Sequence, residues 1–371
     1  MTTEFPFSEL LEQLPKQFFA SLVAKVGAKI KAGHDVINLG QGNPDQPTPG
    51  HIVEAMQQAV ANPKYHKYSP FQGYSFLKKA VAAFYAREYG VDVDPTREVA
   101  ILFGGKAGLV ELPLCLVNPG DVVLVPDPGY PDYWSGIALA RARMEMMPLI
   151  AEQQFLPDYS AIPAAIADQA KLMFLNYPNN PTGATATKEF FAETVAFAAK
   201  YGIAVVHDFA YGAIGFDGKK PVSFLEVDGA KEVGVEIYTF SKTYNMAGWR
   251  VAFAVGNEQI IRAIELLQDH LYVSCSALFK RRLPRRFSVR KIASRSSSHC
   301  MKRAAIRSFL LCTASVGRRR HRLDRFSLGF PYRKDYRPLS LPTYCLNAYT
   351  WRSLRASVLA STAKAMCALV C

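Results

Sequence analysis

The sequence is poor in cysteine, and its few cysteines are unevenly placed. Cys115 is the one cysteine among the first 274 residues, whereas the other six of the seven follow from Cys275 onward. A single thiol cannot build a disulfide framework, so this long first part does not belong to the disulfide-stabilised secreted class. We expect it to fold in a reducing cytoplasm.

Several other signals are missing. No run of 18 or more apolar residues occurs, so we expect no membrane span. The first ten residues, MTTEFPFSEL, lack the charged and apolar regions of a secretory signal. The sequence has no GxSxG elbow, no GxGxxG or GxxxxGK[ST] phosphate loop, and no zinc-ligand spacing, so we expect no metal.

Acidic residues almost vanish from the last quarter of the chain. From Cys275 onward there are 22 Lys and Arg against 2 Asp, a net charge of +20, whereas the preceding residues carry 22 against 29, a net of −7. The last glutamate is Glu265, and only two of 24 glycines lie in the basic segment. A solvated basic tail and a nucleic-acid-binding arm are the ordinary readings of such a segment, but its Phe, Leu, Tyr and Cys follow no steady period.

What is present is a regular alternation of helical and strand patterns. Half of the 371 residues are hydrophobic, enough for a large core. Continuous apolar runs alternating with helices favour an α/β fold with a mainly parallel sheet covered on both faces. Helices are predicted over 8–32, from His51, over 76–90, over 188–201 and from Gln259; strands are predicted over 35–39, 99–103, 121–127, 171–178, 203–208, 236–242 and 249–256.

Polar residues close several of these strands. Asp208 ends the run IAVVHD, where a carboxylate is costly to desolvate unless a cation, such as a protonated pyridine nitrogen, pairs with it. Lys242 ends EIYTFSK, and a lysine buried there could condense with an aldehyde. Arg250 in SKTYNMAGWR could hold a phosphate. A helix cap, a surface charge and a salt bridge are the respective alternatives.

Three further features are weaker. The segment GGKAG joins a strand to a helix, where backbone N–H groups and the helix dipole favour a phosphate. Asn180 opens NPTG after a strand, and it could simply be a turn residue. His207 precedes Asp208 and should point to the opposite face of its strand, as a packed core histidine.

Taken together, these motifs resemble the class I/II, fold-type I aminotransferases that use pyridoxal 5′-phosphate (PLP). The resemblance covers roughly residues 5–274 and rests on PDPGYP, NNPTG, HDFAY and SKTYNMAGWR. Phrases such as VINLGQGNPDQPTP and QDHLYVS are especially similar to the bacterial methionine-salvage transaminases, which pass an amino group, with glutamine as favoured donor, to 4-methylthio-2-oxobutanoate. The resemblance implies a three-layer PLP-transferase fold and a homodimer that acts on amino acids and 2-oxo acids in the cytoplasm.

The resemblance also assigns roles to residues. Lys242 would bind PLP covalently and transfer the proton, Asp208 would hold the ring nitrogen, and Asn180 and Tyr211 would bind the ring's phenolic oxygen. Tyr130 would stack on the ring. Gly42 would lie near the substrate carboxylate. The phosphate would be bound by Gly105, Lys106, Thr239, Ser241 and Arg250, together with Tyr68 of the neighbouring subunit.

The family pattern stops after QDHLYVS. We expect residues 1–45 to form an N-terminal arm and part of a small domain, residues 46–274 to form the large PLP-binding domain, and residues 275–371 to be an aberrant basic tail. The usual small C-terminal domain, with the arginine that pairs with the substrate carboxylate, is lost or replaced. Our hypothesis for this change of composition is a reading-frame shift near codon 275. A chain without that arginine should transaminate poorly.

Two other functions compete with transamination. A PLP-dependent β-lyase acting on C–S bonds of sulfur amino acids would have the same cofactor site. A nucleic-acid-binding protein would use the basic segment, and its binding would weaken steeply with salt. The acidic first part of the chain argues against nucleic acid as a partner.

The frame shift can be tested on the gene. Translating the DNA downstream of codon 275 in the other two frames is expected to restore a family-like C-terminal domain with a carboxylate-binding arginine. If neither frame yields such a domain, the frame-shift interpretation is wrong.

Overall fold

The structure, a computed structural model, describes residues 5–16, 18–38, 42 and 44–272. Contacts divide the chain into two units. Of the described residues, one unit contains 18–38 and 42, where the helix is α2 (Phe18–Lys31). The other contains the described residues 5–16 and 44–272, and it holds every described strand. The domain boundaries expected from the sequence stay predictions, and the expected tail lies outside the described residues.

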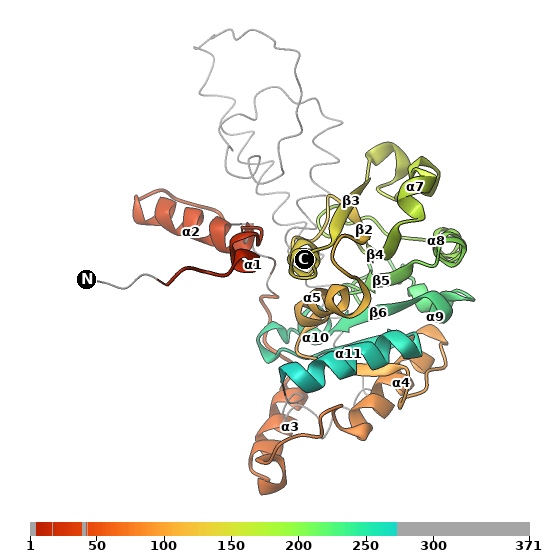
Figure 1. Cartoon of the computed structure of the whole chain (residues 1–371). Helices are drawn as coiled ribbons and strands as arrows, with labels where there is room; N and C mark the ends of the chain where they lie inside the picture. Colours follow the sequence, from red (N-terminus) through yellow and green to blue (C-terminus); the bar gives the residue numbers. More distant parts are fainter. Residues whose placement is uncertain (1–4, 17, 39–41, 43, 273–371) are drawn as a thin grey trace. The chain divides into compact units, whose positions relative to one another are not determined.

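The larger unit is built on a seven-stranded sheet with the order β1-β7-β6-β5-β4-β2-β3 (Figure 1). Only β7 runs against its neighbours, β1 and β6, and the other pairs are parallel. The mainly parallel α/β fold predicted from the sequence is therefore confirmed. The strands are β1 (Val99–Leu102), β2 (Val122–Asp127), β3 (Arg143–Pro148), β4 (Ala170–Asn176), β5 (Ala204–Asp208), β6 (Gly234–Thr239) and β7 (Ala252–Gly256).

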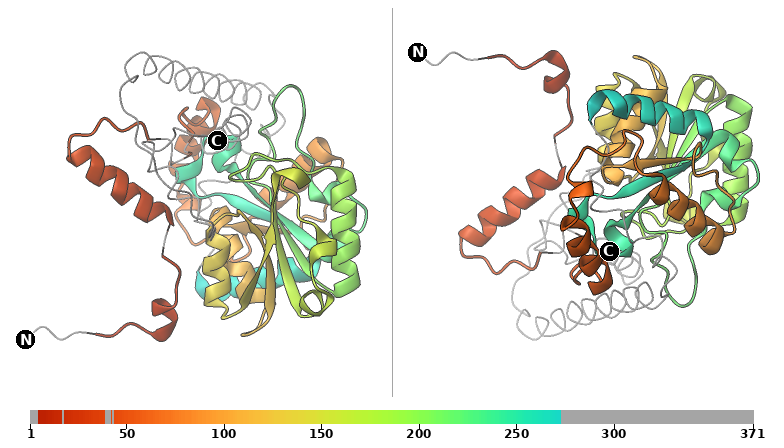
Figure 2. Two further views of the ribbon diagram at one scale, coloured as in Figure 1. Left: turned by 90° about the horizontal axis from the view of Figure 1, so that it is seen from above. Right: turned by 90° about the horizontal axis from the view of Figure 1, so that it is seen from below.

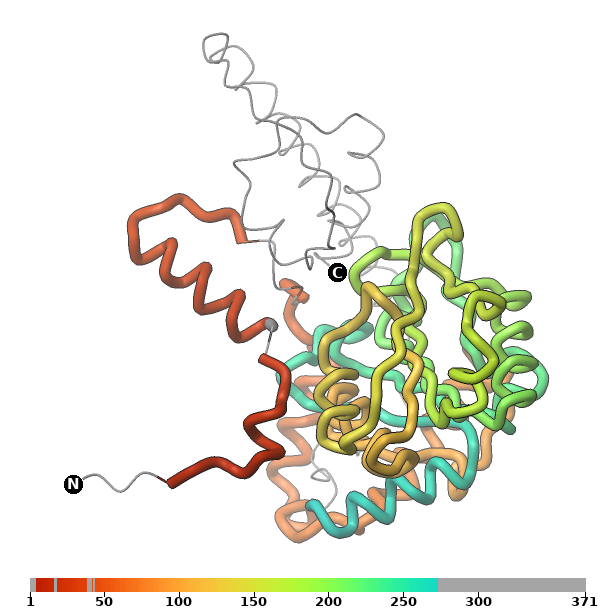
Figure 3. Tube along the Cα trace, turned by 45° about the horizontal axis from the view of Figure 1, so that its top comes forward, coloured from red at the N-terminus to blue at the C-terminus, as the bar shows by residue number. Residues whose placement is uncertain are grey.

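Helices cover both faces of this sheet, as Figures 2 and 3 show for the residues between β1 and the last described helix. One buried cluster joins the sheet to α4 (Ser75–Tyr89) and α8 (Lys188–Tyr201). A second cluster joins the opposite face to α5 (Gly105–Leu116), α6 (Asp132–Leu139) and α11 (Glu258–Leu271). The remaining α-helices of this unit are α1 (Glu9–Glu12), α3 (Gly50–Val60), α7 (Ala164–Ala167), α9 (Ala230–Val233) and α10 (Phe240–Thr243).

Successive strand residues alternate between these two clusters. In β5, Val205 packs with α4 and α8, and Val206 packs with α5, α6 and α11. The same alternation puts His207 and Asp208 on opposite faces, as the sequence predicted. His207 is fully buried, and its Nδ1 lies 2.8 Å from Oε2 of Glu236. It is a core histidine.

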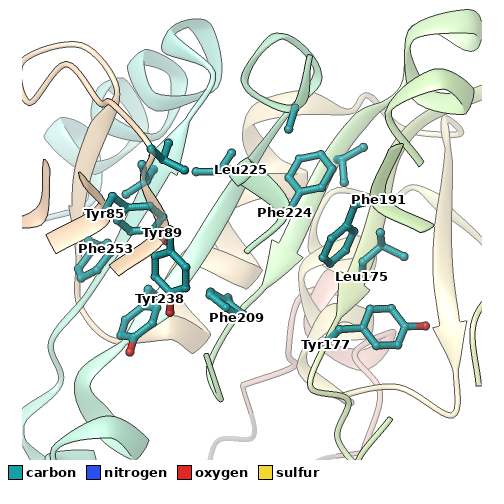
Figure 4. Close-up of a cluster of buried hydrophobic side chains, with 14 of the residues drawn as sticks. Tyr85, Tyr89, Leu175, Tyr177, Phe191, Phe209, Phe224, Leu225, Tyr238 and Phe253 are labelled. Atoms are coloured by element: carbon teal, nitrogen blue, oxygen red, sulfur yellow. The ribbon is translucent and has the colours of Figure 1, made fainter. Parts of the chain in front are cut away.

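Aromatic side chains fill the layer between the sheet and α4 (Figure 4). The rings of Tyr238 and Phe253 stack at 5.4 Å, and Phe209 meets Tyr89 and Tyr238. Aromatic pairs add to area burial, so this layer anchors the strands whose ends carry the polar residues.

The helix ends follow from local chemistry. Thr187 caps α8 by accepting a hydrogen bond from the Phe190 N–H, and Asn257 caps α11. The predicted C-terminal glycine of α4, Gly90, adopts the left-handed conformation with φ 69°.

Three sequence predictions need correction. Strand β3 was missed because it lies at the sheet edge, and Arg143, Met144 and Met146 are exposed, so its sequence lacks a buried run. The helix predicted over 8–32 is divided into α1 and α2. Residues 35–38 form no strand.

No described helix is long and apolar enough to cross a membrane.

Candidate active site

The polar ends of the strands meet at one edge of the sheet. Strands β1, β2, β4, β5 and β6 all run parallel, so their carboxyl ends share this edge, and the reversed β7 begins there. The register aligns Asn176 with Asp208 and aligns Thr239 with Ala252, two residues after Arg250. The edge therefore brings together most of the residues expected from the sequence, namely Gly105, Lys106, Tyr130, Asn180, Asp208, Tyr211, Thr239, Ser241, Lys242 and Arg250.

Asp208 is the buried acid of this edge, with 7% of its surface exposed. Burial raises the pKa of its carboxyl from 3.8 to about 6, although a hydrogen bond from Tyr133 acts in the opposite direction. The Tyr133 hydroxyl lies 2.9 Å from Oδ2, and its ring stacks on Phe174 at 4.6 Å. The Tyr133 hydroxyl and the Ala210 main-chain N–H thus stabilise the charged carboxylate, while burial disfavours it.

Asn180 lies in the loop after β4. Its N–H donates to Oδ1 of Asn176 at 2.7 Å, and Nδ2 of Asn176 donates to the main-chain oxygen of Asp208 at 2.8 Å. Asn176 is 1% exposed. The Asn176 side chain therefore links the loop carrying Asn180 to Asp208 at the end of β5, and Nε2 of His207 in β5 also contacts the main chain of Tyr177 at the start of this loop.

Tyr130 and Lys106 meet at a second acid, Asp132. Lys106 Nζ lies 2.8 Å from Oδ1 of Asp132, whose side chain is 3% exposed. Burial and the neighbouring Asp132 raise the pKa of Tyr130. The tyrosine ring stands edge-to-face against Tyr133 at 5.8 Å. The Lys106 ammonium is thus paired with a carboxylate, while its main chain lies in the first turn of α5.

Lys242 does not end a strand, contrary to the prediction. Strand β6 ends at Thr239, whose hydroxyl accepts a hydrogen bond from the Ser241 N–H at 3.2 Å and donates to the Ser241 hydroxyl at 2.9 Å. This cap starts the short helix α10, which carries a half-buried Lys242. The Thr239 side chain hydrogen-bonds a main-chain N–H that would otherwise continue the strand pairing. A strand predicted from the apolar run alone is therefore too long.

Arg250 and Gly104 are in close contact. Arg250 has φ 54°, and its Nη1 donates to the Ala247 carbonyl at 2.9 Å. A β-carbon built on Gly104 would lie 2.3 Å from Nη2 of Arg250. Gly104 precedes the first turn of α5 with φ 91° and gives it no side-chain cap. The structure therefore places a guanidinium beside a helix N-terminus.

The last three expected residues lie differently. Burial is the main cause that raises the pKa of Tyr133, followed by Asp208 and Tyr130. Tyr211 is close enough to add to this rise. Tyr68 is 89% exposed. Gly42 lies in the smaller unit, so its expected contact stays a prediction.

Sequence reasoning missed Asn176, Tyr133 and Asp132 as parts of the site, whereas Gly104 belongs to the segment GGKAG that it had singled out. Asn176 ends the apolar run KLMFLN just as Asp208 ends IAVVHD, so the same signal could have found it. Tyr133 lies in the first turn of α6, three residues after Tyr130, and the rings of the two tyrosines are in contact. Among the described residues, no group of three or more His, Cys, Asp or Glu could hold a metal.

The chain is similar to known proteins in sequence. The sequence matches the family of class I and II aminotransferases over residues 34–280. It is 71% identical over 271 residues to the L-glutamine–4-(methylsulfanyl)-2-oxobutanoate aminotransferase of Bacillus subtilis, covering 73% of this chain and 68% of that protein. Transaminase BacF of B. subtilis is 58% identical, with 72% and 66% covered, and an LL-diaminopimelate aminotransferase of Desulforudis audaxviator is 51% identical, with 72% and 68% covered.

Solved structures agree. Substrate-bound BacF superposes with a TM-score of 0.80 at 51% identity, covering 85% of this chain and 79% of that one. An aspartate aminotransferase of Thermus thermophilus gives 0.73 at 27% identity, with 82% and 78% covered. The chain thus spans about two thirds of its sequence relatives and shares their fold.

The fold and the polar edge define a PLP-dependent transferase of fold type I. The chain belongs to the class I and II aminotransferase family, and the resemblance noted in its sequence is confirmed.

Replacing Asp208 tests the cost of its burial. In the folded chain its carboxyl has a pKa of about 6, above 3.8, so the folded state binds more protons and loses stability as pH rises through this window. Without cofactor, Asp208→Asn is expected to be more stable than the wild type at pH 8. Its free energy of unfolding, measured by urea denaturation, should be higher by up to about 3 kcal/mol.

This difference should stay nearly constant between pH 8 and pH 7 and then shrink as the pH falls through 6 toward 4, the window between the two pKa values. Added PLP should reverse the order, because it stabilises the wild type more. An equal gap at every pH would show that Asp208 does not titrate in this window.

Proposed function

We propose that this chain binds PLP at the carboxyl edge of its sheet for transamination between glutamine and 4-methylthio-2-oxobutanoate. The observation that carries the substrates is the 71% identity to the B. subtilis enzyme of that name. LL-diaminopimelate is the second candidate substrate, because relatives at 45–51% identity are named for it.

The residues at the edge fit the phosphate of PLP. Gly104 leaves no room for a β-carbon beside the Arg250 guanidinium, and the first turn of α5 has no side-chain cap. A dianion there would meet backbone N–H groups, a helix dipole and a two-pronged cation. The hydroxyls of Thr239 and Ser241 complete the expected phosphate contacts, with main-chain groups of Gly105 and Lys106.

The other end of the edge fits a pyridine ring. Asp208 would pair with a protonated ring nitrogen, which replaces the solvation that burial removed. Asn180 and Tyr211 would donate to the phenolic oxygen, and Tyr130 would cover the ring. The Asp132–Lys106 ion pair supports Tyr130 in this position.

Lys242 would do the covalent and proton-transfer work. Its place in α10, three residues after the end of β6, supports a role between the phosphate contacts and the ring contacts. When bound, PLP supplies the electron sink for the substrate's α-carbon bond. As a free amine, Lys242 would serve as the base and then the acid that moves the proton of that carbon.

Completing the site would require a second copy of the chain and a carboxylate partner. The highly exposed Tyr68 is suited to reach a neighbour's phosphate in a homodimer. Gly42 would contact the substrate carboxylate. Because the sequence lacks the family's carboxylate-binding arginine after Cys275, we propose reduced turnover; losing such a charged pair costs roughly 2–5 kcal/mol.

The absorbance spectrum tests the cofactor assignment. The purified chain with PLP is expected to show a visible band of the lysine-bound cofactor, and Lys242→Ala should abolish it while phosphate-end binding remains. Adding glutamine or LL-diaminopimelate alone should bleach the band, the faster donor identifying the substrate. Steady release of ammonia and pyruvate from cystathionine would favour a β-lyase instead. A wild-type chain without any visible band contradicts the proposal.

A glycine substitution tests the phosphate contacts. Gly104→Ala is expected to weaken PLP binding at least about tenfold, because its β-carbon displaces Arg250. Gly120→Ala is the matched control, since Gly120 has φ 89° but nothing within 4 Å of its β-carbon. Both substitutions place an alanine at a positive φ, so equal losses of affinity in a titration with PLP would contradict the role of Arg250.

A further inference from the structure

Asn176 connects two parts of the site that the chain itself keeps separate. Its side chain accepts from the Asn180 N–H at 2.7 Å and donates to the Asp208 carbonyl at 2.8 Å. Asn176 and Asp208 are aligned residues at the ends of the neighbouring strands β4 and β5. The Asn176 amide, at the end of β4, therefore connects the end of β5 with the loop that follows β4.

Both bonds lie in a buried environment. Asn176 is 1% exposed and Asp208 is 7% exposed. A buried N–H or carbonyl that loses its partner carries its full desolvation cost, so these two bonds hold the groups tightly. An apolar side chain at position 176 could hold neither.

The loop after β4 is bound within itself by a different asparagine. Asn179 Oδ1 accepts from the N–H and hydroxyl of Thr182, and the Asn179 N–H donates to the Ala184 carbonyl. Those bonds make the loop stiff, but they do not connect it to β5. Through Asn176, a stiff loop is tied to the strand end that carries the buried acid.

We infer that Asn176 is a positioning residue that sets the spacing between Asp208 and Asn180, so that both can contact one small aromatic ring. The inference rests on the proposed PLP site. Asn176 touches neither cofactor nor substrate in this role, and acts through the main chain of the two residues that would.

Cofactor analogues can measure this role without enzyme activity. Binding of PLP is compared with binding of two analogues: one with CH in place of the ring nitrogen, and one without the ring hydroxyl. In the wild type, each deletion is expected to lower affinity about tenfold, the worth of one buried hydrogen bond.

In Asn176→Ala and Asn176→Asp, the ratio of the affinity for PLP to the affinity for each analogue should fall below about threefold. The reason is that the contacts of Asp208 with the ring nitrogen and of Asn180 with the ring hydroxyl no longer form together. Asn176→Asp keeps the side-chain volume and the acceptor for the Asn180 N–H but removes the donor to the Asp208 carbonyl, so it provides a second, independent measurement of the same loss. Equal weakening of PLP and both analogues would show a structural role only and would overturn the inference.

Thr194→Val is the matched control. Thr194 lies in α8, on the other face of the sheet, and is also fully buried. Its hydroxyl is hydrogen-bonded to the Tyr159 hydroxyl at 2.7 Å. It should lower the melting temperature and leave the discrimination unchanged. If the wild type binds PLP with a visible band and the Asn176 variants discriminate like it, the inference fails while the proposed function stands; a wild type without the band overturns both.

Discussion

The site depends on a carboxylate that the fold buries at the end of a strand. Asp208 has paid its desolvation cost before any ligand arrives, and its pKa near 6 records that cost. The Tyr133 hydroxyl and the Asn176 amide hold its carboxylate and its carbonyl. A buried acid fixed at two points is a preorganised partner for a cationic ring, since little reorganisation is needed when the ring binds.

The reversed direction of β7 is the second constraint. In an all-parallel sheet, the residue before β7 would lie at the opposite edge from the ends of β1 and β6. Because β7 is antiparallel to both, Arg250 lies beside Gly104 and the first turn of α5. One edge then provides anion contacts near β1 and β7 and a carboxylate on β5, with Lys242 following β6 between them. This separation suits a cofactor that carries a phosphate and a ring cation at its two ends.

Much of this was predictable because it is local. The apolar runs gave six of the sheet strands, and Gly90 marked the end of α4. Strand β3 was not predictable, because an exposed edge strand rich in Met carries no buried pattern. The helix that carries Lys242 escaped because Thr239 ends the strand through its own hydroxyl, a choice that an apolar count does not register. Tyr133 was overlooked because its role is to donate a hydrogen bond to Asp208, which lies 75 positions away in the sequence.

The sequence by itself determined the family, the succession of six of the seven strands, and the polar residues that follow several of them, because these follow from short-range patterns and motifs. Tertiary structure alone decided the direction of β7, the contact between Gly104 and Arg250, and the bonds of Asn176 to Asn180 and Asp208. Those depend on which strands pair and in which register, and pairing is settled by packing two helix layers onto one sheet rather than by any local run of residues.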